Sequence, residues 1–370
     1  MPPPSHAIAL SLTLLGAGGE APLAPRGAIQ WTTTLPGAPA RACVVDEQHV
    51  FQGMMRPIDG QEHALLVALE RTTGRIMWQR EVGLGYPHAA PGIVGALVVH
   101  GGFSGDVLAL DRVTGVERWR FKNGKGGLLS TPMAEQTAGG ERVWLGFIGG
   151  AVALDAATGA ERLRVPMGAG TQVLAVAGGR AFLHGMAENV VLAVDAASGR
   201  ELWRVTGPNI DRERGVFAGF QPEQVAIDQR ALYLPTNVAE TWAVDVVTGK
   251  KRWGYEPTPG GGSFGNVLGL GGAALFLSAS DQKASAVARI DADTGAESWR
   301  RELRGIVHGV PVLVGDVVAV ATGSAGLVAF GARDGEPRFT AKTGASWWGA
   351  CGADGVIYVG HERRKLSAVR

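Results

Sequence analysis

The sequence predicts an all-β protein, a single eight-bladed β-propeller with four-stranded blades, from three observations. First, a phrase of the form Asp-x-x-Thr-Gly-x-x-x-Trp follows a short apolar run and recurs at intervals of 40 to 50 residues. Second, no stretch has the spacing of a long amphipathic helix. Third, the chain holds 56 glycines, which suits a fold with a tight turn every few residues. A repeat of this length built from strands and turns is typical of a propeller.

Each copy of the phrase predicts one β-hairpin. The apolar run, such as residues 107–110, is a half-buried strand. The Asp and Thr side chains can hydrogen-bond the backbone of the following turn, and the Gly supplies a positive φ there. The Trp begins the next strand and offers a large apolar face for packing between sheets. Two further strands precede each phrase, so one repeat makes one blade.

Seven copies follow one another along the chain. Four match the pattern closely, at residues 111–119, 195–203, 245–253 and 291–299. Three are weaker because another residue replaces the Asp or the Trp, at residues 70–78, 155–163 and 331–339.

The eighth copy is split between the two ends of the chain. Residues 366–370 form an apolar strand that stops where the Asp would stand, and residues 27–31 read Gly-Ala-Ile-Gln-Trp, the second half of the phrase. We therefore expect residues 28–34 to pair with residues 365–369, which completes blade eight and leaves no open sheet edge. The propeller domain is predicted to span residues 27–370.

Residues 1–26 lie outside the repeat and form a predicted leader. Residues 7–15 are apolar and precede the small residues 16–19, which resembles a secretory signal and is too short to span a membrane. The basic residues of a secretory signal are missing before this run, and no cysteine lies nearby to carry a lipid. We expect a periplasmic or other extracytoplasmic location. A Pro-rich leader on a cytoplasmic protein is the alternative.

Composition narrows the range of partners. A net charge of +1 with scattered signs gives no nucleic-acid or membrane-surface footprint. Although 370 residues could hold two domains, the continuous repeat favours one. We expect a monomer without a transmembrane span whose partners are proteins.

The phrase resembles the tryptophan-docking repeat of quinoprotein dehydrogenases, which bind pyrroloquinoline quinone (PQQ), and of many relatives that bind no quinone. Within that superfamily, the length, the eight repeats and the split closing blade resemble the BamB family, the propeller subunits of the bacterial outer-membrane β-barrel assembly machine. The resemblance covers residues 27–370. It implies a non-catalytic protein-binding scaffold of the bacterial envelope, with outer-membrane assembly components as partners, no catalytic residue and no cofactor.

The resemblance also implies a partner-binding loop. Residues 209–212, Asn-Ile-Asp-Arg, are similar to a loop through which BamB contacts the barrel subunit of the machine. Residues 206–221 combine mixed charges with aromatic side chains, a composition typical of a protein contact rim and its hot spot. Residues 215–217 depart from the family, because BamB has acidic residues there. The candidate contact residues are Asp211, Arg212, Arg214 and Phe217.

Two alternatives concern PQQ. A quinoprotein dehydrogenase would hold the quinone against Ca²⁺, with oxygen ligands, a carboxylate base and a disulfide ring of adjacent cysteines. Here Cys43 and Cys351 are not adjacent, and the chain lacks the long insertions of those enzymes, so catalysis is not favoured. The second alternative is a sensor that binds PQQ or another small molecule at the channel mouth, with Trp347 and Trp348 as ligand candidates.

His88 and His308 raise the question of a metal site. Each stands three residues before the Pro that opens an innermost strand, so both should lie near one mouth of the channel. They belong to blades two and seven, roughly 135° apart around an eight-bladed ring. This separation is too large for one ion, and we expect no metal site.

The two cysteines belong to the innermost strands of blades one and eight. Cys43 and Cys351 occupy what the sequence suggests is the same position of the repeat. Equivalent side chains point the same way around a ring, so a Cys351 that faces blade one implies a Cys43 that faces blade two. A disulfide needs Cα atoms within roughly 7 Å and side chains turned toward each other. We therefore expect two buried, unpaired thiols.

Overall fold

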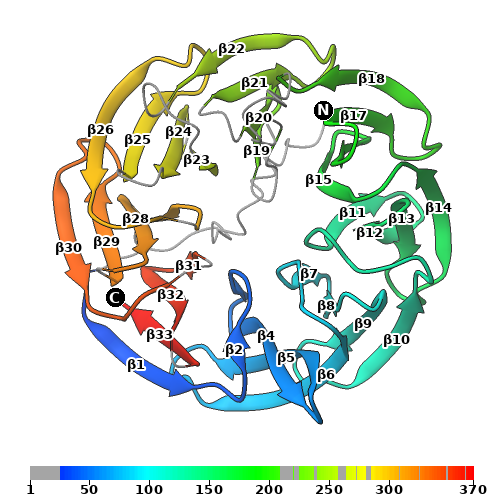
Figure 1. Ribbon diagram of the computed structural model, residues 1–370, viewed down its shortest axis with the longest axis horizontal. Coiled ribbons are helices and arrows are strands. Elements are labelled where there is room, and N and C mark those ends of the chain that lie inside the picture. Colours follow the sequence, from blue (N-terminus) through cyan, green and yellow to red (C-terminus); the bar gives the residue numbers. More distant parts are fainter. Residues whose placement is uncertain are drawn as a thin grey trace.

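In the computed structural model the chain forms eight antiparallel β-sheets arranged in a ring, as Figure 1 shows. The described residues are 26–208, 220, 225–236, 240–256, 264–271, 273–280, 285–307, 309–324, 326–346, 349–362 and 364–370, and for residues 264–271 only the backbone is described. The predicted eight-bladed propeller is confirmed. In this part of the chain no helix is long and apolar enough to cross a membrane.

The first four blades follow one another along the chain. Blade one contains β2 (Ala38–Pro39), β3 (Val44–Val45), β4 (His49–Ile58), β5 (Gln61–Glu70) and β6 (Ile76–Leu84). Blade two contains β7 (Gly92–Val94), β8 (Leu97–Gly101), β9 (Asp106–Asp111) and β10 (Glu117–Lys122). Blade three contains β11 (Met133–Thr137), β12 (Gly140–Phe147), β13 (Gly150–Asp155) and β14 (Glu161–Pro166). Blade four contains β15 (Thr171–Ala177), β16 (Arg180–Gly185), β17 (Val190–Asp195) and β18 (Glu201–Thr206).

The other four blades complete the ring. Blade five contains β19 (Ala226–Ile227), β20 (Ala231–Pro235), β21 (Thr241–Asp245) and β22 (Lys251–Tyr255). Blade six contains β23 (Phe264–Gly271), β24 (Ala274–Ser280), β25 (Ser285–Asp291) and β26 (Glu297–Leu303). Blade seven contains β27 (Val312–Val314), β28 (Val317–Thr322), β29 (Gly326–Gly331) and β30 (Pro337–Ala341). Blade eight contains β31 (Ala350–Ala353), β32 (Val356–His361), β33 (Lys365–Val369) and β1 (Ile29–Thr34).

Blade eight joins the two ends of the chain as the sequence predicts. β1 pairs with β33, from Ile29 opposite Val369 to Thr34 opposite Lys365. Ala28 and Arg370 extend the ladder, because each backbone N–H donates to the other residue's carbonyl, at 2.8 and 2.9 Å. The first and last strands of the propeller therefore cover each other's open edges.

The Asp-x-x-Thr-Gly turn is stabilised as the sequence predicts. In blade two the Oδ1 atom of Asp111 accepts hydrogen bonds from the backbone N–H of Thr114 (2.9 Å) and of Val113 (3.2 Å), and from the Thr114 hydroxyl (2.9 Å). Gly115 has a φ of 66°, which a residue with a Cβ rarely adopts. The turn therefore depends on the Asp, the Thr and the Gly together.

The Trp of each phrase docks on the Gly of the following blade. A Cβ on Gly115 would lie 2.6 Å from the ring of Trp78, so only glycine leaves room for the docked ring. The indole N–H then donates to the carbonyl of the residue after the turn's Asp, as Trp78 does to Arg112 (3.2 Å). Six Trp–Gly pairs share this arrangement: Trp31–Gly74, Trp78–Gly115, Trp119–Gly159, Trp203–Gly249, Trp253–Gly295 and Trp299–Gly335.

Two blade interfaces lack the docked Trp. Between blades three and four, Leu163 contacts Gly199, and the Arg142 guanidinium donates to the carbonyl of Ala196 (3.2 Å), the acceptor that an indole uses elsewhere. Between blades seven and eight, Phe339 packs against Gly27. The substituted interfaces thus keep the apolar contact, and the first also keeps the hydrogen bond.

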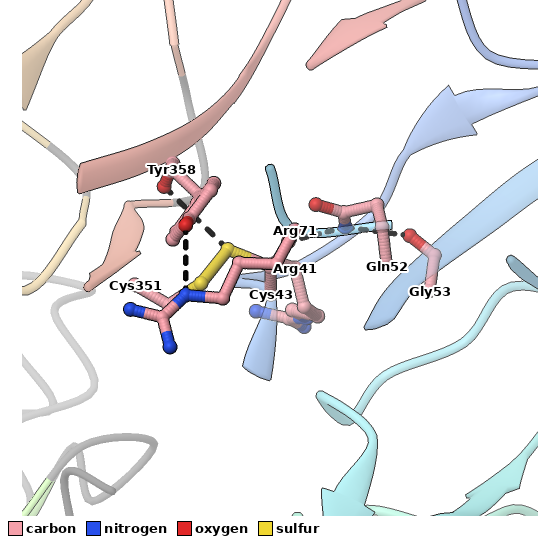
Figure 2. Close-up of a disulfide and its surroundings, with 7 residues drawn as sticks. All are labelled: Arg41, Cys43, Gln52, Gly53, Arg71, Cys351 and Tyr358. Carbon is pink, nitrogen blue, oxygen red and sulfur yellow. Dashed lines mark hydrogen bonds between the residues drawn. A yellow bond between two sulfur atoms is a disulfide. The ribbon is translucent and has the colours of Figure 1, made fainter. Parts of the chain in front are cut away.

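The expectation of two unpaired thiols is wrong, because Cys43 and Cys351 form a disulfide. Their Cα atoms are 5.5 Å apart, much closer than the roughly 10 Å between flat stacked sheets. Both cysteines belong to one apolar cluster between blades one and eight. Figure 2 shows the disulfide with Tyr358 and Arg71 beside it. The bond joins residues that are 308 positions apart in the sequence.

The error lies in the strand alignment. Cys351 pairs with Tyr358, and the residue of blade one that corresponds to Tyr358 is Phe51, since each pairs with an alanine opposite the docking Trp of its blade. Phe51 pairs with Val44, so Val44 is the equivalent of Cys351. Cys43 lies one position earlier and its side chain points the other way, toward blade eight.

The innermost strand of blade one is interrupted, which the sequence pattern does not reveal. β2 pairs with β4 through Ala38 and Pro39, and β3 pairs with β4 through Val44 and Val45. Cys43 lies in the segment between these two short strands. This blade therefore has five strands where we predicted four.

Arg71 adds polar contacts to the same interface. Its guanidinium donates to the hydroxyl of Tyr358 (3.0 Å) and to the carbonyl of Ala353 (2.9 Å), and it forms an ion pair with Asp354 (2.8 Å). Figure 2 shows Arg71 and Tyr358 beside the disulfide. The interface between blades eight and one is thus held at the outer edge of the ring by β1. Closer to the centre it is held by Arg71 and the disulfide.

Candidate protein-binding face

The two faces of the ring carry different connections. In an antiparallel blade of four strands, the first and third turns lie on one face, which we call the turn face. The second turn and the connection to the next blade lie on the other, which we call the loop face. The Asp-x-x-Thr-Gly turns, such as residues 112–116 and 156–160, all lie on the turn face and have one length. Connections on the loop face range from two-residue turns, such as residues 148–149, to residues 207–225.

Exposed apolar side chains meet on the loop face between blades one and two. Leu84 ends β6 and is 45% exposed, and Phe103 lies in the turn between β8 and β9 and is 44% exposed. The two segments are joined by a hydrogen bond from the N–H of Ser104 to the carbonyl of Leu84 (3.0 Å). The ring of Phe103 contacts His88 (centroids 4.9 Å apart), and His88 contacts Tyr86 (5.2 Å). We call Leu84, Tyr86, His88 and Phe103 the Leu84–Phe103 patch.

Glycines hold the backbone close beneath this patch. A Cβ on Gly127 would lie 2.6 Å from the Cα of Phe103, and a Cβ on Gly85 would lie 2.9 Å from its Cβ. Gly85 also has a φ of 83°. Phe103 is therefore positioned by close contacts with glycines of both neighbouring connections.

The patch is flanked by elements of blade one. The Tyr86 hydroxyl donates to the carbonyl of Ala40 (3.4 Å), and the Arg41 guanidinium lies over the Tyr86 ring, 6.0 Å from its centroid. On the other side, β4 and β5 extend to a two-residue turn at Asp59 and Gly60, and the carbonyl of Glu62 accepts from the N–H of Gly85 (2.7 Å). The patch thus lies between the inner segment of blade one and its long hairpin.

The described ends of the predicted partner-binding loop are fixed by one residue. Asn189, in the turn between β16 and β17, accepts from the N–H of Phe220 through Oδ1 (3.0 Å) and donates to the carbonyl of Pro208 (3.0 Å). Its own carbonyl accepts from the N–H of Gly207 (2.8 Å). Phe220 is buried and packs edge-on against Trp242. Both described ends of the loop are therefore anchored on the loop face.

Most of the predicted site residues lie outside the described residues. This applies to the partner-binding candidates Asp211, Arg212, Arg214 and Phe217, to the ligand candidates Trp347 and Trp348, and to His308. His88 is described and belongs to the Leu84–Phe103 patch. Sequence reasoning missed Tyr86 and Phe103, although both are aromatic residues next to glycines in connections of the loop face.

Three buried histidines lie in the second strands, toward the loop face. His100 and His184 lie at the ends of β8 and β16, and His361 ends β32. Burial lowers the pKa of each to about 4, and the Lys365 charge also lowers that of His361. His184 and His361 bond to Gln172 and Ser367, whereas neither ring nitrogen of His100 has a partner among the described residues.

The described residues do not fit a PQQ–Ca²⁺ centre. No three His, Cys, Asp or Glu side chains of this part of the chain gather to hold a metal ion. The two cysteines bridge separate blades, whereas the dehydrogenases carry an adjacent pair. The absence of catalysis stays a prediction.

Eight blades that dock at six interfaces through Trp–Gly pairs and close through both chain ends define a propeller of the quinoprotein-like class. The family model described as outer membrane protein assembly factor BamB matches residues 21–177, 104–265, 187–288 and 283–370. The chain belongs to this family. No curated protein is similar enough in sequence to count as a match.

Solved structures share the fold at low sequence identity. BamB from Moraxella catarrhalis is 18% identical with a TM-score of 0.65, over 93% of this chain and 99% of that one. A quinohemoprotein alcohol dehydrogenase from Comamonas testosteroni is 14% identical with a TM-score of 0.64, over 93% and 76%. The computationally designed protein Ika8 is 14% identical with a TM-score of 0.68, over 91% and 98%. An enzyme, an assembly factor and a design share this ring, so the likeness specifies the fold alone.

Proposed function

We propose that this protein is a non-catalytic protein-binding scaffold of the bacterial envelope that serves outer-membrane protein assembly. The observation that carries the proposal is the Leu84–Phe103 patch, in which exposed Leu84 and Phe103 lie beside half-buried Tyr86 and His88 on the loop face. Binding hot spots are enriched in aromatic side chains whose positions are fixed before the partner arrives. Membership of the BamB family supports the same role.

The loop anchored by Asn189 provides a second part of the proposed surface. It begins and ends on the loop face, as the Leu84–Phe103 patch does. We propose that Asp211, Arg212, Arg214 and Phe217 contact the partner, on the resemblance of residues 209–212 to a BamB loop. A partner large enough to reach both regions would cover the loop face.

The disulfide supports an extracytoplasmic location. Disulfides persist in oxidising compartments such as the periplasm and are rare in the cytosol. The bond between Cys43 and Cys351 joins the first and last blades inside the apolar core, where it has a structural role. This agrees with the signal-like character of residues 7–15.

Crosslinking in envelope extracts, followed by pull-down, tests the scaffold. We expect the Leu84→Ala/Phe103→Ala variant to lose at least tenfold of the crosslinked partner, because truncating a hot-spot residue typically costs about 2 kcal/mol or more. The matched control is Val113→Ala/Val247→Ala, which removes apolar side chains that are 54% and 59% exposed on the turn face. Equal capture by both double variants would contradict the choice of face.

The same experiment separates the two parts of the surface. We expect Asp211→Ala/Arg212→Ala to reduce capture through lost contacts. We expect Asn189→Ala to reduce it through the loss of the loop anchor. If the Asp211→Ala/Arg212→Ala variant recovers the same partners in the same amount, the loop is not part of the contact surface.

A second candidate is a sensor that binds PQQ or another flat small molecule at the loop face. The contacting rings of Tyr86, His88 and Phe103 support it, since aromatic faces bind planar ligands by stacking. Isothermal titration with PQQ, with and without Ca²⁺, tests binding to the wild-type protein and to Phe103→Ala. Dye reduction with alcohols or glucose tests catalysis. Heat without dye reduction would favour the sensor, and dye reduction would revive the dehydrogenase hypothesis.

A further inference from the structure

We propose that Cys43 and Cys351 are the site of a thiol oxidation that seals the ring after export, and only once the last blade has packed on the first. The proposal rests on the envelope location under the proposed function. It assigns the protein as a substrate of a dithiol oxidase and gives the disulfide a definite place in the order of folding.

The order follows from the positions of the two cysteines. They are 308 residues apart, and Cys351 lies on β31, near the end of the chain. Cys43 reaches it only through the cluster that blades one and eight form together, which includes Tyr358 and Leu366. A chain whose last blade is not yet packed therefore keeps both thiols. The disulfide marks completed rings.

The exposure of the two cysteines sets the order in which their thiols react. Cys43 is buried, with 4% of its surface exposed, whereas Cys351 is only partly buried. The thiolate of Cys351 attacks the disulfide of the oxidase and forms a mixed disulfide. The thiolate of Cys43 then attacks the sulfur of Cys351 and expels the oxidase thiolate. Two thiols of the protein lose two electrons and two protons, and the oxidase disulfide gains them as a dithiol.

The disulfide and the pairing of the chain ends lie at different distances from the centre of the ring. β1 joins β33 at the outer edge of blade eight, while Cys351 lies on β31, the innermost strand. Without the disulfide, the β1 pairing and the Arg71 contacts to Tyr358 and Asp354 still hold the interface. We infer that reduction leaves the ring folded and loosens its inner edge.

Mass measurement of the exported full-length protein tests the seal. The protein is denatured without reductant and alkylated. We expect no alkylation in cells with a periplasmic dithiol oxidase and two alkylated cysteines in cells without it. The Trp31→Ala variant removes the docked ring at the closing blade and should raise the alkylated fraction severalfold. The matched control, Trp203→Ala, removes a docked ring on the far side of the ring and should remain oxidised.

Hydrogen exchange then tests the effect of the bond. In Cys43→Ser/Cys351→Ser, or after reduction, we expect faster exchange in residues 38–45 and 350–353, unchanged exchange in blade four, and a lower unfolding midpoint in urea. Two outcomes would overturn the proposal. One is two free thiols in the exported wild-type protein, and the other is oxidation of Trp31→Ala as complete as that of Trp203→Ala. Partner capture is a separate readout, so an oxidised protein that captures no partner would count only against the scaffold.

Discussion

The turn face of the ring carries turns of uniform length, whereas the loop face carries connections of varied length. On the turn face, the Asp-x-x-Thr-Gly turns have one length, and most accept a docked aromatic ring from the preceding blade. On the loop face, connections range from two-residue turns, such as residues 148–149, to residues 207–225. The apolar Leu84–Phe103 patch lies on this variable face. The repeat therefore stabilises the ring from one face and leaves the other face free to acquire binding surfaces.

The two faces also differ in their response to acid. On the turn face, hydrogen bonds from Arg118 and Thr114 hold the pKa of Asp111 below its usual range, and those from Thr294 do the same for Asp291. Lowered carboxyl pKa values stabilise the fold above about pH 4 and lose that effect below it. Toward the loop face, buried histidines such as His100 have lowered pKa values. Their stabilisation decreases as the pH falls from 6.5 to about 4, which is a higher pH range than that of the carboxylates.

Substitution of a docking glycine should have the largest effect and would test the rule of the turn face. Gly115→Ala places a Cβ 2.6 Å from the ring of Trp78 at a φ of 66°. We expect a loss of roughly 3 kcal/mol of unfolding free energy, from the strained backbone and the displaced ring together. Urea unfolding followed by circular dichroism measures it.

Two other glycines separate the contributions. Gly60 has a similar φ of 78° with no atom within 4 Å of an added Cβ, so Gly60→Ala should cost only about 1 kcal/mol. A Cβ added to Gly199 would lie 3.2 Å from Leu163, where no Trp docks, and Gly199→Ala should fall between the two. If Gly115→Ala and Gly60→Ala cost the same, ring docking does not stabilise the blade interface.

The sequence predicts the turn face almost completely. The spacing of the phrase is sufficient for the blade count and for the pairing of β1 with β33, because most copies carry the Asp, Thr, Gly and Trp that the turn and the docking need. It does not predict that Arg142 supplies the hydrogen bond at the interface where Leu163 replaces the Trp. Such a contact depends on a side chain from another strand, outside the phrase.

The loop face is predicted much less well, for two physical reasons. Its connections follow no repeat, so the proximity of Phe103, His88 and Tyr86 depends on how two unrelated connections pack. The alignment of the innermost strand also fails where β2 and β3 interrupt it, which reversed the expected direction of Cys43. An error of one residue in a strand inverts a side chain, and no periodic signal corrects it.

Removal of a buried histidine should have the second-largest effect and would sharpen the contrast in acid response. The pKa of about 4 for His100 lies below its ordinary value of 6.5, so between these values the unfolded chain binds a proton that the folded chain does not. Stability from this group is therefore full above pH 6.5 and decreases as the pH falls. Between pH 7 and pH 5 it should decrease by about 2 kcal/mol. In His100→Leu that part of the decrease should be absent.

Urea unfolding at pH 7 and pH 5 measures this difference. The control is His63→Leu, because His63 lies near the surface beside Glu81 (2.7 Å) and not in the core. An unchanged pH dependence in His100→Leu would show that the acid response of the loop side has another origin.

The smallest expected effect tests whether the docked ring contributes a hydrogen bond as well as apolar contact. Trp119→Phe keeps most of the packing on Gly159 but removes the N–H that donates to the buried carbonyl of Ala156 (2.8 Å). We expect a loss of about 1 kcal/mol, since that carbonyl is left without its partner. Trp242→Phe is the control: its N–H donates to Glu240, which also binds Lys251, so the loss should stay below about 0.5 kcal/mol. Equal losses would mean that the docked ring stabilises the interface by packing alone, as Phe339 does on Gly27, and that the indole donor on the turn face is not needed.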